Sequence, residues 1–364
     1  MLQKSGYRNS SIDILKFIFA ISIVLFHFGS HREINILQGG YIFVEGFFMI
    51  TGYFMMVSAN KTTEKCIGKD TLNFIKHKYL SFAPTLIASV IIAQIITIII
   101  YRLSPTAIAL DLLNSVTEII PLQITGIRGS ALTAVAWYLS AMMIALFILY
   151  PAARKFGKSF THIFCPVVAV MIYGILCKEV GFLNTITEYD FFIPVQSGIF
   201  RAVAGICTGC MLYECIKATE KYKVSRFGEV CFLGAELISL AFIFFVARFL
   251  PKTYYDFYTL PAFFVLLYCC FGRKSVISKR FSFNFTKFFG TASLIIYLNH
   301  NNWKYHPDIF YRDSVILSFV IYLLLVIGAC VAVAILTILL RKFWKFIKKP
   351  LKKHFVGEAS DFLQ

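Results

Sequence analysis

Long apolar segments, separated by short polar connections, run along the whole chain. Each segment holds about 17 to 25 mostly apolar residues, enough for a helix that crosses roughly 30 Å of bilayer hydrocarbon. No comparable stretch alternates polar and apolar residues as a membrane β-strand does, and a helix satisfies its own backbone hydrogen bonds in lipid. The pattern therefore predicts an all-α, polytopic membrane protein. We expect about ten transmembrane helices, near residues 12–30, 41–58, 79–101, 132–151, 161–177, 193–216, 230–250, 257–272, 286–303 and 314–340.

The composition agrees with this pattern, and the positions of the charges predict the orientation of the protein in the membrane. Of the 364 residues, 58% are hydrophobic and only 15% are charged. A net charge of +17 could suggest nucleic acid, but most Lys and Arg residues fall in alternate connections, which the positive-inside rule places in the cytoplasm together with both termini. We expect one transmembrane domain over residues 1–345 and a basic cytoplasmic tail over 346–364. Such a tail would bind anionic membrane lipid, and no nucleic-acid partner is expected.

The ten cysteines behave as small apolar residues in this pattern. None falls in a connection expected outside the cell, where disulfides would form. Cys207 and Cys210 are close in "CTGC", but they lie inside an apolar segment and have no second pair nearby. We therefore expect neither a metal site nor a redox site.

His27 lies inside an apolar run, "IVLFHF", where a polar side chain needs a partner or a function. Lys16 precedes it by eleven residues, about three helical turns, so both side chains lie on one helix face, about 16 Å apart along the axis. For either residue alone, a structural role is the more common explanation: a hydrogen-bonded core histidine, or a lysine that extends to the membrane surface. Their shared face favours a function.

Other polar residues fall at the depth expected for His27, in the outer half of the membrane. Buried charges need partners in lipid, so we expect these side chains to meet. They include Glu45, Trp137, Tyr138, Arg201, Tyr297, Asn299 and His300. At the expected inner surface, Lys76 and Lys78 resemble an ordinary basic loop. Near Lys16 they could instead attract a phosphorylated donor from the cytosol.

Five stretches carry a resemblance to a known family. They are, in chain order, "SIDILKFIFAISIVLFHF", "VEGFFMITGYF", "WYLSAMMIALFILYP", "FRAVAGICTGCML" and "ASLIIYLNH". In this order, across residues 8 to 303, they resemble the motifs of the integral-membrane acyltransferase family 3, which includes glycan O-acetyltransferases. The family usually has arginine where this chain has Lys16. It also usually has two arginines where this chain has Lys78 and Ser81.

The resemblance implies transfer of an acyl group, usually acetyl, from cytosolic acetyl-CoA or another acyl-CoA. The acceptor would be a hydroxyl of an extracytoplasmic or lipid-linked glycan, and the location a bacterial-type plasma membrane. In this reading His27 is the general base and Glu45 orients it or stabilises its cation. The coenzyme phosphates would be held by Lys16, Lys76 and Lys78. The oxyanion and the acceptor would be bound by Trp137, Tyr138, Arg201, Tyr297, Asn299 and His300.

A transporter is the alternative from another class. Buried charges and the glycines Gly198, Gly205 and Gly209 would also suit a substrate pathway through the membrane. The sequence shows no internal repeat of the kind that many transporters have, and transport does not require a histidine base. A receptor or scaffold would fit the hydropathy but leaves the buried polar residues unexplained.

Overall fold

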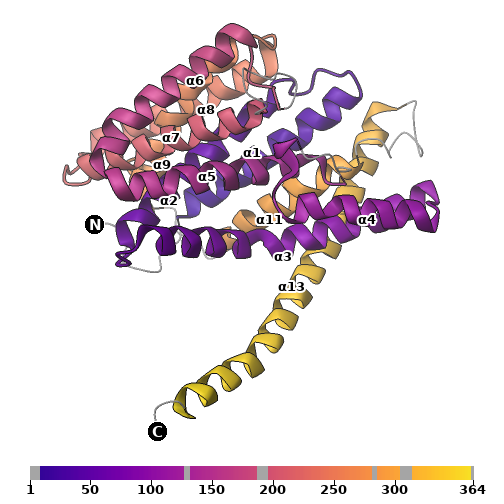
Figure 1. Cartoon of the computed structure of the whole chain (residues 1–364). Helices are drawn as coiled ribbons and strands as arrows, with labels where there is room; N and C mark the ends of the chain where they lie inside the picture. Colours follow the sequence, from indigo (N-terminus) through magenta and orange to yellow (C-terminus); the bar gives the residue numbers. More distant parts are fainter. Residues whose placement is uncertain (1–8, 127–131, 187–195, 281–284, 304–313, 362–364) are drawn as a thin grey trace.

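The computed structural model describes residues 9–126, 132–186, 196–280, 285–303 and 314–361, with side chains as far as Trp344, and these parts contain helices and no strand (Figure 1). The α-helices are α1 (Ser10–His31), α2 (Phe43–Lys61), α3 (Ile67–Tyr101), α4 (Pro105–Ile119), α5 (Trp137–Phe156), α6 (Cys165–Glu179), α7 (Ser197–Thr219), α8 (Arg226–Phe249), α9 (Tyr255–Gly272), α10 (Val276–Arg280), α11 (Thr286–Asn299) and α13 (Val315–Asp361). Short turns include the 3-10 helices η1 (Gly40–Ile42), η3 (Ala134–Ala136) and η5 (His300–Trp303) and the π-helix η4 (Phe160–Phe164).

Nine helical segments of the described chain are long and apolar enough to cross a membrane. This confirms the prediction of an all-α polytopic membrane protein. The predicted span 286–303 forms a shorter element, the 14-residue α11 followed by the turn η5. Side chains on the outer helices remain largely exposed, among them Ile238 of α8 and Ile316 of α13, as expected for surfaces that face lipid.

The helix α4 was not predicted. It occupies the connection between α3 and α5, begins with the Ser104 side chain accepting a hydrogen bond from the Ala107 N–H, and packs against α3 (Figure 1). Its buried Glu118 accepts hydrogen bonds from the backbone N–H groups of Leu132 and Thr133, just before α5. Burial raises the pKa of the Glu118 carboxyl, and these hydrogen bonds oppose the shift. Glu118 thereby fixes the point at which the chain enters α5.

Close packing of α2 against α7 organises the centre of the bundle. A Cβ atom on Gly209 would lie 2.0 Å from the carbonyl oxygen of Met49, and one on Gly52 would lie 2.0 Å from that of Ile206. The backbones touch because these positions have no side chain, which is the common way that membrane helices approach closely. Arg201 lies two turns before Gly209 on α7, so the same packing brings it to Glu45 on α2.

The helix α1 packs along α11 and gives the bundle two chemically distinct ends. Lys16 lies near the start of α1, and His27 lies near its end. We call the end that contains Lys16 and Lys78 the lysine end, and the end that contains His27 and His300 the histidine end. Which end faces the cytoplasm stays a prediction.

The last helix, α13, continues as one element from Val315 to Asp361. The backbone of the predicted tail, 346–364, is therefore helical as far as Asp361, and this part extends away from the other helices (Figure 1). The side chains of the tail lie outside the described residues.

Candidate active site

A cavity of about 140 Å³ lies at the histidine end, with His27 in its wall. Its walls include parts of α1, η1, α2, η3, the start of α5, α7, α11 and η5, several of which are far apart in the sequence. Its polar and aromatic lining includes His27, Tyr41, Trp137, Arg201, Tyr297 and Asn301. We call this space the His27 cavity.

The two histidines predicted at one depth lie beside each other. The ring centroids of His27 and His300 are 5.0 Å apart, and the Phe26 ring lies 4.9 Å from that of His27. His27 is half-buried, while His300 is fully buried with its Nδ1 3.1 Å from the carbonyl oxygen of Ile296. The structure thus presents one imidazole to a cavity and packs a second against it.

A buried ion pair joins α2 to α7 at the same depth. The Arg201 Nε donates to Glu45 Oε1 at 2.8 Å, and neither side chain is more than 1% exposed. The Tyr173 hydroxyl of α6 donates to Glu45 Oε2 at 2.7 Å. Both carboxylate oxygens therefore have strong donors, as a charge buried this deeply requires.

Arg201 makes two further contacts and keeps one donor. Its Nη1 donates to the carbonyl oxygen of Thr185 at 3.1 Å, and its guanidinium lies 5.4 Å from the centre of the Trp137 ring. Its Nη2 is buried and has no hydrogen-bond partner among the described residues. Arg201 also lines the His27 cavity, so this buried donor belongs to a residue of the cavity wall.

The predicted orientation of His27 by Glu45 stays a prediction. The oxygens of Glu45 bond Arg201 and Tyr173, whereas the His27 ring lies against Phe26 and His300. Glu45 thus contacts Arg201, a residue of the cavity wall.

The predicted oxyanion donors separate into different places. Of these, Arg201 lies in the His27 cavity, together with Trp137 and Tyr297. Asn299 does not line this cavity. Its amide nitrogen donates to Ser89 Oγ of α3 at 3.1 Å and to the Ile295 carbonyl at 2.8 Å. Tyr138 lines a second cavity, and its ring centroid lies 5.6 Å from that of Tyr297.

The second cavity, of about 210 Å³, lies toward the lysine end. We call it the lysine cavity because Lys16 of α1 and Lys78 of α3 both line it. The Lys16 ammonium lies 5.3 Å from the centre of the Phe54 ring. Lys76 is exposed on α3 and does not line the cavity, so the structure brings together two of the three predicted phosphate-binding lysines.

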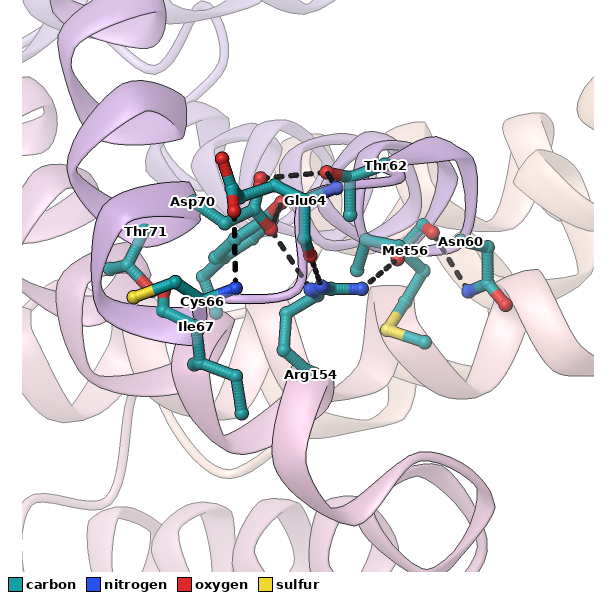
Figure 2. Close-up of polar contacts among 11 residues, drawn as sticks. Met56, Asn60, Thr62, Glu64, Cys66, Ile67, Asp70, Thr71 and Arg154 are labelled. Carbon is teal, nitrogen blue, oxygen red and sulfur yellow. Dashed lines mark hydrogen bonds and ion pairs between the residues drawn. The ribbon is translucent and has the colours of Figure 1, made fainter.

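A second ion pair fixes the helix that carries Lys78. Arg154, at the end of α5, contacts Asp70 with Nε 2.9 Å from Oδ2, and its Nη1 and Nη2 donate to the carbonyl oxygens of Ala59 and Glu64 (Figure 2). The Tyr150 hydroxyl donates to the same carboxylate at 2.8 Å, and that of Thr62 donates to its other oxygen. The connection between α2 and α3 is therefore tied to α5.

Sequence reasoning missed several residues that hold the site. Tyr173 was hidden in an apolar segment, although a tyrosine in lipid usually needs a partner for its hydroxyl. Tyr41 in the cavity wall donates to Asp256 at 2.8 Å, and the same carboxylate accepts from the Leu183 N–H. Asp256 at the edge of an apolar segment was the available signal. No group of three His, Cys, Asp or Glu residues in the described chain could hold a metal ion.

The fold and the site together define the class of this protein: a multi-pass helical membrane protein with a histidine in an internal cavity. A family model described as an acyltransferase domain, that of acyltransferase family 3, matches residues 9–339. The chain therefore belongs to acyltransferase family 3 and is a membrane acyltransferase. Comparisons with curated proteins and with solved structures gave no match.

Proposed function

We propose that this protein transfers an acyl group, acetyl in the first instance, from a cytosolic acyl-CoA to a hydroxyl group of an extracytoplasmic or lipid-linked glycan. Family membership supports the acyl transfer. The observation that carries the rest is that a cavity with two lysines and a cavity with a histidine meet at one side chain, Tyr297. The proposed setting is a bacterial-type plasma membrane with the lysine end in the cytoplasm.

The lysine cavity is the proposed donor site. Lys16 and Lys78 supply positive charge for the phosphates of the coenzyme, and Lys76 adds charge at the nearby surface. Lysine binds phosphate as a point charge, without the two-pronged geometry of the arginines that are usual in this family. The flexible arm of the coenzyme would then extend toward Tyr297.

His27 is the proposed general base. A carbohydrate hydroxyl is a weak nucleophile, and neutral imidazole can remove its proton near pH 7 as the oxygen attacks the thioester carbonyl. The Nη2 of Arg201 is the proposed donor to the resulting oxyanion. When the C–S bond breaks, the proton held by His27 passes to the coenzyme A thiolate.

The remaining residues hold these groups or the acceptor. Glu45 and Tyr173 fix the guanidinium of Arg201, which limits its motion during the reaction. His300 lies behind His27, and the Trp137 ring offers an apolar face to a sugar. Asn299 contributes through its packing against α3.

Release of free coenzyme A from acyl-CoA tests the proposal. The purified protein in lipid nanodiscs is assayed with and without an envelope glycan extract, beside His27→Ala and the control His162→Ala, which changes an exposed histidine on η4. We expect acceptor-dependent release that falls by about 100-fold or more in His27→Ala and is unchanged in the control. His300→Ala should have a milder effect. No release from any acyl-CoA by the folded wild type would contradict the proposal and favour the transporter.

A further inference from the structure

Tyr297 of α11 separates the two cavities. It is the one described residue that lines both of them. Its side chain is 5% exposed, and its hydroxyl donates to the carbonyl oxygen of Val135, in the wall of the His27 cavity, at 3.1 Å. The Tyr297 ring therefore lies where the two cavities meet.

Two more rings pack against Tyr297. Phe47 of α2 and Tyr138 of α5 line the lysine cavity next to Tyr297. The ring centroids of Tyr138 and Tyr297 are 5.6 Å apart, and Phe47 lies 6.0 Å from Tyr138 and 6.2 Å from Tyr297. These are contact distances for aromatic pairs, so the three rings pack against one another. We call this group the aromatic partition.

We propose that the aromatic partition selects the acyl group by its length, with Tyr297 as the residue that determines specificity. The inference rests on the proposed function, because it assumes that the coenzyme binds in the lysine cavity and His27 acts on the thioester. The acyl group leads the thioester through the partition. Each added methylene must displace more of three rings that come from three different helices, which resist displacement because cores are closely packed.

The partition takes no part in the bond changes. The thioester C–S bond breaks, the ester C–O bond forms, and the proton of the acceptor hydroxyl passes through His27 to the thiolate. Phe47, Tyr138 and Tyr297 decide which acyl groups reach that reaction. Their effect therefore appears in the ratio of kcat/KM between acyl donors. Damage to the fold would instead lower kcat/KM for all donors by a similar factor.

The test compares acetyl-CoA, butyryl-CoA and hexanoyl-CoA in the full-length protein. For the wild type we expect kcat/KM to fall by about 100-fold from acetyl to butyryl, since one excess methylene in a close-fitting site costs about tenfold. Tyr297→Ala removes the shared ring and should reduce this ratio by about tenfold or more. Tyr297→Phe keeps the ring and should keep the wild-type ratio. If Tyr297→Ala does not fold, Phe47→Ala takes its place in the test, because it removes another ring of the partition.

Tyr213→Ala is the matched control. Tyr213 is a buried tyrosine of α7 that packs on Tyr53 and lines neither cavity, so its truncation removes a similar volume elsewhere. This variant should show the wild-type ratio, whatever its absolute activity. The inference is overturned if Tyr297→Ala and Phe47→Ala transfer acetyl with the wild-type ratio, or if Tyr213→Ala changes the ratio equally. A wild type inactive with every acyl-CoA would instead refute the proposed function itself.

Discussion

Two ion pairs in this protein are built from the same three groups. In one, Glu45 contacts Arg201 Nε at 2.8 Å and accepts from the Tyr173 hydroxyl at 2.7 Å. In the other, Asp70 contacts Arg154 Nε at 2.9 Å and accepts from the Tyr150 hydroxyl at 2.8 Å. The first lies beside the His27 cavity, and the second ties α5 to the connection between α2 and α3.

The two arginines differ in what remains after the ion pair is made. Arg154 directs both terminal nitrogens to backbone carbonyls of the connection, and its side chain is 17% exposed (Figure 2). Arg201 uses Nη1 on Thr185 and keeps Nη2 buried and without a partner among the described residues. An arginine whose two terminal nitrogens both hold backbone carbonyls fixes structure, whereas one with a buried terminal nitrogen left over can bind a reacting group.

Removal of the arginine should give the largest difference in stability between the two ion pairs. We expect Arg201→Gln to lower the free energy of unfolding by about 3–5 kcal/mol, because it leaves the fully buried Glu45 carboxylate without its counter-charge. Arg154→Gln should cost less, since Asp70 keeps Thr62 and Tyr150 and lies nearer the surface. Denaturant unfolding in detergent, followed by circular dichroism, measures both. An equal loss in the two variants would break the comparison.

Conservative replacement should then separate catalysis from stability. Arg201→Lys keeps the charge beside Glu45 but removes Nη2, and we expect kcat to fall by about 100-fold or more, as for loss of an oxyanion donor. Arg154→Lys loses backbone hydrogen bonds and should lower stability while kcat changes little. The coenzyme A release assay and the same unfolding experiment, applied to both variants, give the two values. If Arg201→Lys keeps its kcat, Arg201 is structural like Arg154.

The tyrosines offer a finer version of the same contrast. Tyr173→Phe and Tyr150→Phe each remove one hydrogen bond to a charged acceptor and should each cost about 2 kcal/mol of unfolding free energy. Tyr173→Phe should also lower kcat, because Glu45 then holds Arg201 less firmly. Tyr150→Phe should leave kcat unchanged and raise KM for acyl-CoA, since α3 carries Lys78. A rise in KM alone for Tyr173→Phe, or a fall in kcat for Tyr150→Phe, would contradict the roles given to the two ion pairs.

Two lysines of α3 provide the smallest expected effect. Lys78→Gln should raise KM for acyl-CoA by about tenfold, the value of one charge-assisted hydrogen bond. Lys76 lies two residues away but is exposed and outside the lysine cavity, so Lys76→Gln should change KM less. Steady-state kinetics at fixed ionic strength compares the two. Equal changes would mean that general surface charge, and not the cavity, binds the donor.

The sequence predicted the features that depend on one helix at a time. Nine apolar spans were visible in hydropathy alone, and helical periodicity placed Lys16 and His27 on one face of α1, where they line the two cavities. The need of buried charges for partners predicted that polar residues such as Glu45 and Arg201 would meet, but not which of them would pair.

Features that depend on which helices are neighbours could not be predicted in this way. Asn299 bonds Ser89 because α11 packs on α3, and Tyr173 reaches Glu45 because α6 packs on α7. The hydropathy pattern of a single helix does not indicate which other helices will be its neighbours. The amphipathic α4 was missed for a different reason, since its polar residues resemble those of a loop.

The close contact between α2 and α7 also has a consequence for biogenesis. Glu45 is synthesised 156 residues before Arg201. During translation α2 therefore enters the membrane with a carboxyl group whose partner has not yet left the ribosome, and it needs a temporary partner in the insertion machinery, in lipid headgroups or in water. When α7 arrives, Gly52 and Gly209 let the two helices approach, and only then is the carboxylate paired within the protein. A nascent chain arrested before α7 should thus be a preferred target of membrane proteases.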